Sequence, residues 1–105
     1  MSPLVSIWDD AYDPRGLPIP FDGEGLPRQR VDIVREGVVG QAVYDRYTAR
    51  KAATQPTGHA ITPEWRMMGP VATNLFMAPG NATLEEMIAG TQRGVFCLLY
   101  TSRRG

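Results

Sequence analysis

Glycine and proline interrupt this chain so often that only short helices and strands can form in it. Its 105 residues include 11 glycines and 9 prolines. Proline removes a backbone donor and fixes φ, and glycine loses more conformational entropy on folding than any other residue. Residues 13–25 are rich in both, so we expect an irregular crossing there. Residues 54–70 form a second irregular segment, long enough that we expect it to be functional or held by another part of the protein.

The clearest local pattern lies between these two segments. Residues 28–34 alternate between polar and apolar side chains, as a half-buried strand does. The turn Arg35-Glu36-Gly37 follows, with Gly37 placed to accept a positive φ, and residues 38–44 resume as a strand. The sequence therefore predicts a β-hairpin.

Two short helices carry signals for their first turn. Asp45 precedes a helix expected over residues 46–53, and its carboxylate can accept hydrogen bonds from free backbone N–H groups. Thr83-Leu84-Glu85-Glu86 is a capping box that begins a second helix, which we expect Gly94 to end. Further strands are expected over residues 4–8, 71–77 and 95–100. The order predicts an α+β fold: a mixed sheet with a central β-hairpin and two short helices, forming a partial domain of a larger protein.

The composition excludes several classes of partner. Lys plus Arg and Asp plus Glu both number 11, so the chain lacks the positive excess that binding to nucleic acid requires. Its longest apolar run is much too short to span a membrane, and its amino terminus lacks the pattern of a signal peptide. A single cysteine, Cys97, excludes an internal disulfide. We therefore expect a cytoplasmic chain with no direct nucleic-acid or membrane partner.

Five polar residues are candidates for substrate binding or for lining a cleft: His59, Asn74, Asp45, Arg46 and Arg50. No metal ligand lies at a suitable local spacing from His59, which favours a loop or packing role for it. Asn74 lies within a strand, where a buried amide needs hydrogen bonds, so it can organise a neighbouring loop or contact substrate. The other three are also explained by a capped helix with a solvated face. The sequence predicts no catalytic residue and no metal ligand in this chain.

Two acidic pairs are interpreted as parts of turns. Adjacent strand residues point to opposite faces, which argues against a shared acid–base pair at Asp9 and Asp10. Asp22-Gly23-Glu24-Gly25 lacks the later ligands and the closing glutamate of a calcium loop. We expect its carboxylates to accept hydrogen bonds from backbone amides.

Several segments, in order along the chain, resemble the carboxy-terminal domain of the TldD/PmbA family. They are Asp9-Asp10, FDGEGLPRQR, IVREGVV, DRYTARKA, Thr57-Gly58-His59, Thr73-Asn74-Leu75-Phe76 and PGNATLEEMIAGTQRGVF. We interpret residues 1–96 as a partial domain of this family, closer to its PmbA-like side. Residues 97–105 do not continue the pattern, and we expect them to be foreign sequence.

The resemblance implies a function for the parent protein. Members of the family are metallopeptidases once described as modulators of DNA gyrase. A parent of this kind would be a zinc-dependent hydrolase that acts on peptide or unfolded substrates as a homo- or heterodimer. Its zinc would be held by an upstream His-Glu-x-x-x-His helix, which these 105 residues lack, so we expect the fragment alone to be inactive. This segment would supply scaffold, dimer or substrate-cleft contacts. The alternative is a non-catalytic PmbA-like partner subunit of a peptidase heterodimer.

Overall fold

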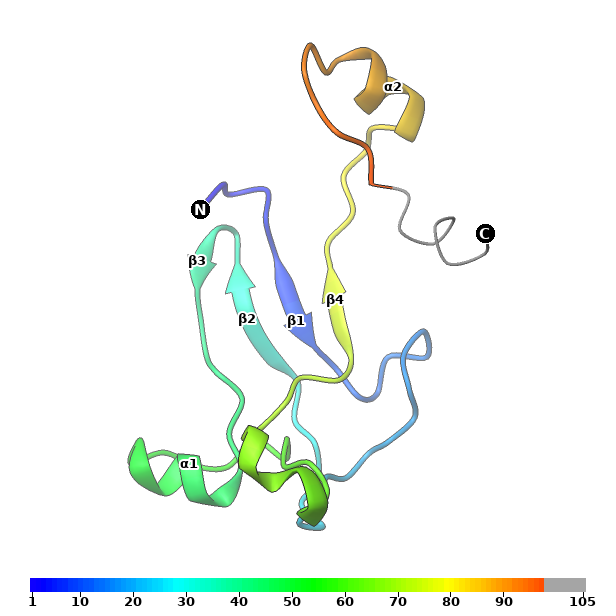
Figure 1. Ribbon diagram of the computed structural model, residues 1–105. Helices are drawn as coiled ribbons and strands as arrows, with labels where there is room; N and C mark the ends of the chain where they lie inside the picture. Colours follow the sequence, from blue (N-terminus) through cyan, green and yellow to red (C-terminus); the bar gives the residue numbers. More distant parts are fainter. Residues whose placement is uncertain (98–105) are drawn as a thin grey trace.

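The computed structural model describes residues 1–97, which form a four-stranded sheet with short helices around it (Figure 1). The strands are β1 (Ile7–Asp9), β2 (Val31–Arg35), β3 (Val38–Val39) and β4 (Leu75–Met77), in the order β3-β2-β1-β4. The predicted α+β class and the hairpin are confirmed. All three strand pairings are antiparallel, so the prediction of a mixed sheet was wrong. A long crossing after the hairpin brings β4 beside β1, and the two strands run in opposite directions. The hairpin of β2 and β3 therefore lies at one side of the sheet rather than at its centre.

The turn between β2 and β3 has the geometry that a two-residue hairpin requires. Glu36 and Gly37 both have positive φ, 50° and 80°. The prediction of positive φ at Gly37 is confirmed, but β3 is much shorter than the strand expected over residues 38–44. At Gly40 an added Cβ would lie 2.3 Å from the Asp32 carbonyl oxygen. Beyond β3 the pairing is irregular, because the consecutive N–H groups of Gly40 and Gln41 donate to the Ile33 and Asp32 carbonyls at 2.8 and 3.1 Å.

The two outer strands are also shorter than expected. β1 begins at Ile7 rather than at residue 4, and β4 begins at Leu75 rather than at residue 71. Before β4, the Val71 N–H donates to the His59 carbonyl at 3.0 Å and is therefore not available to β1. The strand expected over residues 95–100 and the tail 97–105 lie largely outside the described residues.

Both predicted helix starts are confirmed. α1 (Arg46–Lys51) is capped by Asp45 and α2 (Leu84–Ala89) by Thr83, each with a complete capping box. Both predicted helix ends were wrong, because α1 ends at Lys51 rather than at residue 53 and α2 ends at Ala89, before Gly90, rather than at Gly94. The segment over residues 54–70, expected to be irregular, contains the 3₁₀ helix η1 (Pro63–Met68). Pro63 suits the first position of a helix, because its missing N–H would have no partner there and its φ is already helical. Within residues 1–97 no helix has the length and apolar character needed to cross a membrane.

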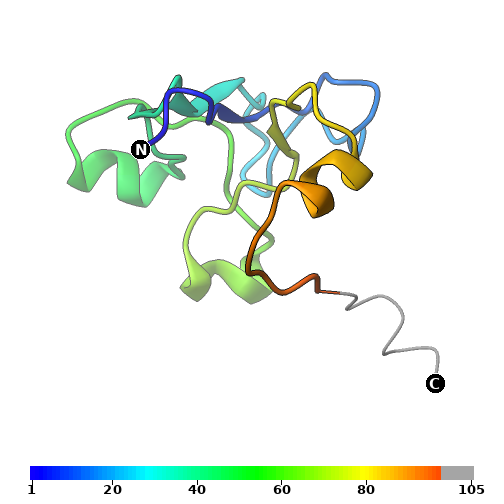
Figure 2. The same cartoon turned by 90° about the horizontal axis from the view of Figure 1, so that it is seen from above.

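The core is small and mostly polar. Its buried apolar residues are Ala11, Val31, Val34, Ala49 and Ala60, and its buried polar residues are Asp9, Asp22, Arg28, Asp45, Thr57, His59 and Asn74. The radius of gyration is 17.2 Å, whereas a compact domain of this length has about 13 Å. Figure 1 shows α2 beyond one end of the sheet and α1 at the other end, and Figure 2 shows the helices spread apart from one another. The fold therefore leaves much apolar surface uncovered.

Candidate functional site

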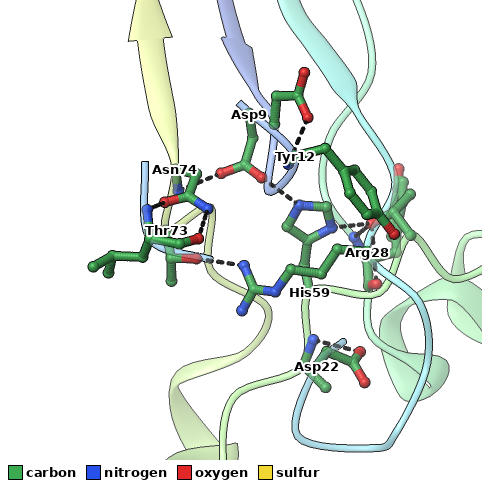
Figure 3. Close-up of polar contacts among 12 residues, drawn as sticks. Asp9, Tyr12, Asp22, Arg28, His59, Thr73 and Asn74 are labelled. Atoms are coloured by element: carbon green, nitrogen blue, oxygen red, sulfur yellow. Dashed lines mark hydrogen bonds and ion pairs between the residues drawn. The ribbon is translucent and has the colours of Figure 1, made fainter. Parts of the chain in front are cut away.

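A buried polar network joins the end of β1 to two distant segments (Figure 3). We define the Asp9 network as Asp9, Thr57, His59 and Asn74. Asp9 is the last residue of β1, and its side chain is fully buried. Its Oδ2 lies 2.9 Å from His59 Nε2, and its Oδ1 accepts the Asn74 backbone N–H at 2.7 Å. Each carboxylate oxygen therefore holds a different segment in place.

His59 uses both of its ring nitrogens inside this network. Nε2 faces Asp9, and Nδ1 lies 2.8 Å from Thr57 Oγ1. Thr57 Oγ1 in turn accepts the Tyr44 N–H at 2.7 Å and lies 3.2 Å from the Tyr44 carbonyl. A neutral ring with its proton on Nε2 satisfies every partner, because the Thr57 hydroxyl can donate to Nδ1. A charged ring also satisfies every partner, because the hydroxyl can then donate to the Tyr44 carbonyl.

Asn74 ties the irregular crossing of residues 13–25 to the sheet. Its Oδ1 accepts the Leu17 N–H at 2.8 Å, and its Nδ2 donates to the Leu17 carbonyl at 2.8 Å. Its own carbonyl accepts the Asp10 N–H at 3.1 Å. At Gly16 an added Cβ would lie 2.9 Å from the same Oδ1, so the close approach needs glycine there. The structure thus confirms the predicted contact of Asn74 with a neighbouring loop.

The described residues do not fit a zinc ion. Both nitrogens of His59 already have partners within the protein, and its side chain is 0% exposed. Within residues 1–97 no three side chains of His, Cys, Asp or Glu gather as metal ligands would. Zinc in a catalytic site needs three protein ligands and an open position for water. We therefore assign no metal chemistry to this part of the chain.

Sequence reasoning missed Asp9, because its main partner, His59, lies 50 positions away in the chain. The prediction that both members of the pair belong to turns is wrong for Asp9 but correct for Asp10, which accepts the Tyr12 N–H at 2.9 Å. The prediction for Asp22 is confirmed. Its Oδ1 accepts two backbone N–H groups of its own turn, and its Oδ2 accepts the Ala60 N–H at 2.9 Å.

The five candidate residues separate into two places. His59 and Asn74 belong to the Asp9 network, whereas Asp45, Arg46 and Arg50 line a hollow of about 450 Å³ beside α1. We call it the α1 hollow. Two acidic residues line it. Asp45 is occupied by the helix cap, because its Oδ1 accepts the Thr48 N–H at 2.7 Å and the Thr48 hydroxyl at 2.6 Å, and Glu24 Oε2 accepts the Arg46 N–H at 3.1 Å. Arg66 also lines the hollow, so its arginines outnumber its carboxylates.

A larger groove of about 590 Å³ lies next to the network, and sequence reasoning did not find it. Its lining includes Arg28, Thr73, Phe21, Trp65 and Met68, and we call it the Arg28 groove. Arg28 is 6% exposed, and its Nη1 donates to Thr73 Oγ1. Its Nε is buried and has no hydrogen-bond partner among the described residues. Arginine at the start of a polar–apolar alternation is typical of a solvated face, so the pattern gave no sign of its burial.

Known proteins share both the sequence and the fold of this chain. It matches the family described as PmbA/TldA metallopeptidase C-terminal domain over residues 1–102. The chain belongs to this family. A zinc metalloprotease TldD homolog of Saccharolobus solfataricus is 29% identical over 84 residues, which are 79% of this chain and 19% of that protein. The resemblance inferred from the sequence is thereby confirmed.

Two solved structures of family members superpose on most of the chain. TldE from Thermococcus kodakarensis gives a TM-score of 0.73 at 27% identity, covering 89% of this chain and 22% of that one. A Thermotoga maritima protein, named as a candidate modulator of a DNA gyrase, gives 0.70 at 35% identity, covering 83% and 19%. The 105-residue chain therefore spans about a fifth of the length of the relatives that it matches.

Proposed function

We propose that the chain is a supporting part of a larger zinc-dependent metallopeptidase that degrades peptide or unfolded substrates. In this proposal it provides scaffold, dimer contacts and part of the substrate cleft, and the zinc ligands lie elsewhere in the parent protein. Membership of a metallopeptidase family supports the proposal, as does the name of the Saccharolobus relative, a zinc metalloprotease. The small polar core and the uncovered apolar surface are what a segment that packs against more polypeptide would have.

The observation that carries the proposal is the apolar face of α2. Leu84, Met87, Ile88, Val95 and Phe96 line one hollow of about 380 Å³, and each is between 44% and 97% exposed. The helix has only six residues and ends at Gly90, so its stability must come from packing rather than from its own hydrogen bonds. An apolar face of this kind is best explained by contact with another part of the enzyme or with its dimer partner.

The free edge of the sheet supports a role in the substrate cleft. β4 is the last strand in the order, paired on one side with β1. Leu75 and Met77 are 56% and 61% exposed. An extended peptide can add to such an edge through main-chain hydrogen bonds, which suits a peptidase with many substrates.

Metal content and activity test this function. The full-length parent protein should contain stoichiometric zinc and hydrolyse an unfolded peptide, whereas the purified 105-residue chain should hydrolyse none even with added zinc. Hydrolysis by the 105-residue chain would refute the supporting role.

A matched pair of variants tests the role of α2. Ile88→Gln in the parent protein should weaken its assembly, because the substitution puts a polar group into the apolar face. Glu85→Gln, which introduces the same residue elsewhere on the same short helix, should leave assembly unchanged. Light scattering measures the mass of the assembly for both variants, and equal masses would count against the proposed contact.

The alternative function is a non-catalytic partner subunit of a peptidase heterodimer. The structural similarity to TldE of Thermococcus kodakarensis, which covers 89% of this chain, is the observation that favours this alternative. The two functions differ in one measurable property. A partner subunit would contain no stoichiometric zinc by elemental analysis and would acquire peptidase activity only when mixed with a zinc-bearing homologue.

A further inference from the structure

We propose that the Arg28 groove binds the carboxy-terminal residue of a peptide, with the α-carboxylate on Arg28 and the apolar side chain against Phe21, Trp65 and Met68. The inference rests on the proposed function, because it assigns a binding position within that substrate class. It differs from addition of a strand to β4, which needs no charged group.

The charge of Arg28 has no ion-pair partner among the described residues. Its side chain is 94% removed from solvent. A buried charge without a partner is strongly unfavourable, so buried arginines are normally paired. The buried Nε also lacks a hydrogen-bond acceptor among the described residues. Arg28 therefore needs an anionic acceptor from outside this part of the chain.

The acidic residue of the groove cannot serve as that acceptor. Asp22 lines the same groove, but both of its oxygens accept backbone N–H groups from Glu24, Leu26 and Ala60. Figure 3 shows Arg28 extending toward Thr73, to which it donates, and shows Asp22 apart from it. The guanidinium is thus held at one nitrogen by Thr73, which orients it for a second, charged partner.

The apolar wall identifies the rest of the ligand. Phe21, Trp65 and Met68 line the groove and are 60%, 63% and 68% exposed. A ligand residue that fits must therefore combine a carboxylate with an apolar side chain. The last residue of a peptide has both on a single Cα atom, whereas an aspartate or glutamate side chain supplies the charge alone. The two oxygens of a carboxylate can also accept from two N–H groups of the planar guanidinium, which a single acceptor atom cannot do with the same geometry.

The first test uses the full chain with one background substitution, Trp8→Phe, so that Trp65 is its single tryptophan. The peptide acetyl-Ala-Ala-Phe is titrated with a free carboxylate and, separately, as its amide, while Trp65 fluorescence is followed in a Trp8→Phe background. We expect the free acid to bind roughly tenfold more tightly than the amide, as for one charge-assisted pair. A third peptide, acetyl-Ala-Asp-Phe-amide, carries its charge on an internal side chain and should bind no better than the amide. Equal affinities for acid and amide, or no measurable binding of either, would overturn the proposal.

Variants then assign the effect to the groove. Arg28→Met should abolish the preference for the acid, whereas Arg35→Met, which removes an exposed arginine at the end of β2, should preserve it. If Arg28→Met fails to fold by circular dichroism, Met68→Glu replaces it, because an exposed carboxylate added to the groove should compete for Arg28 and weaken the acid at least severalfold. An unchanged preference in a folded variant would refute the assignment. These binding measurements use no metal, so their failure leaves the zinc and peptidase tests of the parent protein unaffected.

Discussion

Replacement of Asp9 by alanine should destabilise the chain far more than replacement of its neighbour Asp10. Asp9 accepts from His59 Nε2 at 2.9 Å and from the Asn74 N–H at 2.7 Å, and the side chains of Asp9 and His59 are both 0% exposed. Asp10 lies at a partly exposed position, 3.6 Å from Arg30. The two residues are identical in chemistry and adjacent in sequence. The difference in free energy of unfolding between the two alanine variants therefore measures the effect of their different burial and hydrogen bonding.

The magnitude follows from the groups left without partners. Asp9→Ala leaves the Nε2–H of His59 and the N–H of Asn74 buried and unpaired, and each such group costs about 1–3 kcal/mol. The expected loss is therefore about 2–6 kcal/mol. Asp10→Ala removes a surface ion pair and one turn hydrogen bond, with an expected loss of about 1 kcal/mol. A whole domain is stable by only about 5–15 kcal/mol, so the first variant removes much of the total.

Urea unfolding followed by Trp8 fluorescence measures both losses. Trp8 precedes Asp9 in β1 and stacks on Phe76, with ring centroids 6.1 Å apart. A Trp65→Phe background removes the signal of the other tryptophan. If the free energies of unfolding of the two alanine variants agree within about 0.5 kcal/mol, the Asp9 network does not hold the fold together.

The variant Asp9→Asn separates shape from charge. Its side-chain oxygen can still accept the Asn74 N–H, and its amide can donate to His59 Nε2 if the ring proton moves to Nδ1. Thr57 Oγ1 then accepts a hydrogen bond from the Nδ1–H group, and its own hydroxyl donates to the Tyr44 carbonyl, 3.2 Å away. His59 and Asn74 each keep a hydrogen bond to residue 9, so the loss should be smaller than for alanine. The change of tautomer should appear in the ¹⁵N chemical shifts of the imidazole, and an unchanged ring would contradict the proposed hydrogen-bond pattern.

Three further predictions concern single turns and caps. Gly58→Ala should destabilise the chain by at least about 2 kcal/mol more than Gly25→Ala. Both glycines have positive φ (73° and 74°), but only a Cβ at Gly58 would lie 2.2 Å from a carbonyl oxygen. Equal losses of stability in thermal unfolding would contradict this prediction. Hydrogen bonds from the Arg15 side chain and backbone lower the pKa of the Asp13 carboxyl from 3.8 to about 2. The contribution of this carboxylate to folding stability is therefore present above pH 3.8 and is lost as the pH falls through about 2. Arg15→Gln should raise that pKa in an NMR titration, and a midpoint that stays near 2 would exclude the guanidinium as the cause. Thr83→Ala should lower the helicity of α2 by circular dichroism with a loss of about 1 kcal/mol, and unchanged helicity would show that the cap is dispensable.

Features that depend on neighbouring residues could be predicted from the sequence. The N-cap at Asp45 and the capping box at Thr83 need groups only three residues apart, and the turn at Gly37 depends on one glycine. Those predictions are confirmed. The helix η1 was missed because Pro63 at its start and Gly69-Pro70 after it are equally typical of a loop, and a 3₁₀ helix has no strong periodicity of its own.

Features that depend on distant partners could not be predicted in this way. The Asp9–His59 contact joins residues 50 positions apart, and the Arg28–Thr73 contact joins residues 45 positions apart. A local spacing rule found no ligand near His59, although a carboxylate lies beside it in the fold. Composition likewise could not show that Arg28 is buried, because arginine is most often exposed. The candidate site therefore emerged from the fold and not from motifs.

Under the proposed function, the polar core also predicts that folding of the chain is coupled to its packing against a neighbouring polypeptide. The largest fully buried side chains are His59, Val31 and Asp9, so the interior fixes geometry through hydrogen bonds but buries little apolar area. Met87 and Ile88 are still 53% and 56% exposed, and covering each should add roughly 1–2 kcal/mol. A neighbouring polypeptide that covers them binds the folded state and not the unfolded one, and therefore stabilises the fold by mass action. The Asp9 network would then hold the sheet and its loops in the shape that such a neighbour recognises, while the neighbour supplies the apolar burial that the chain lacks.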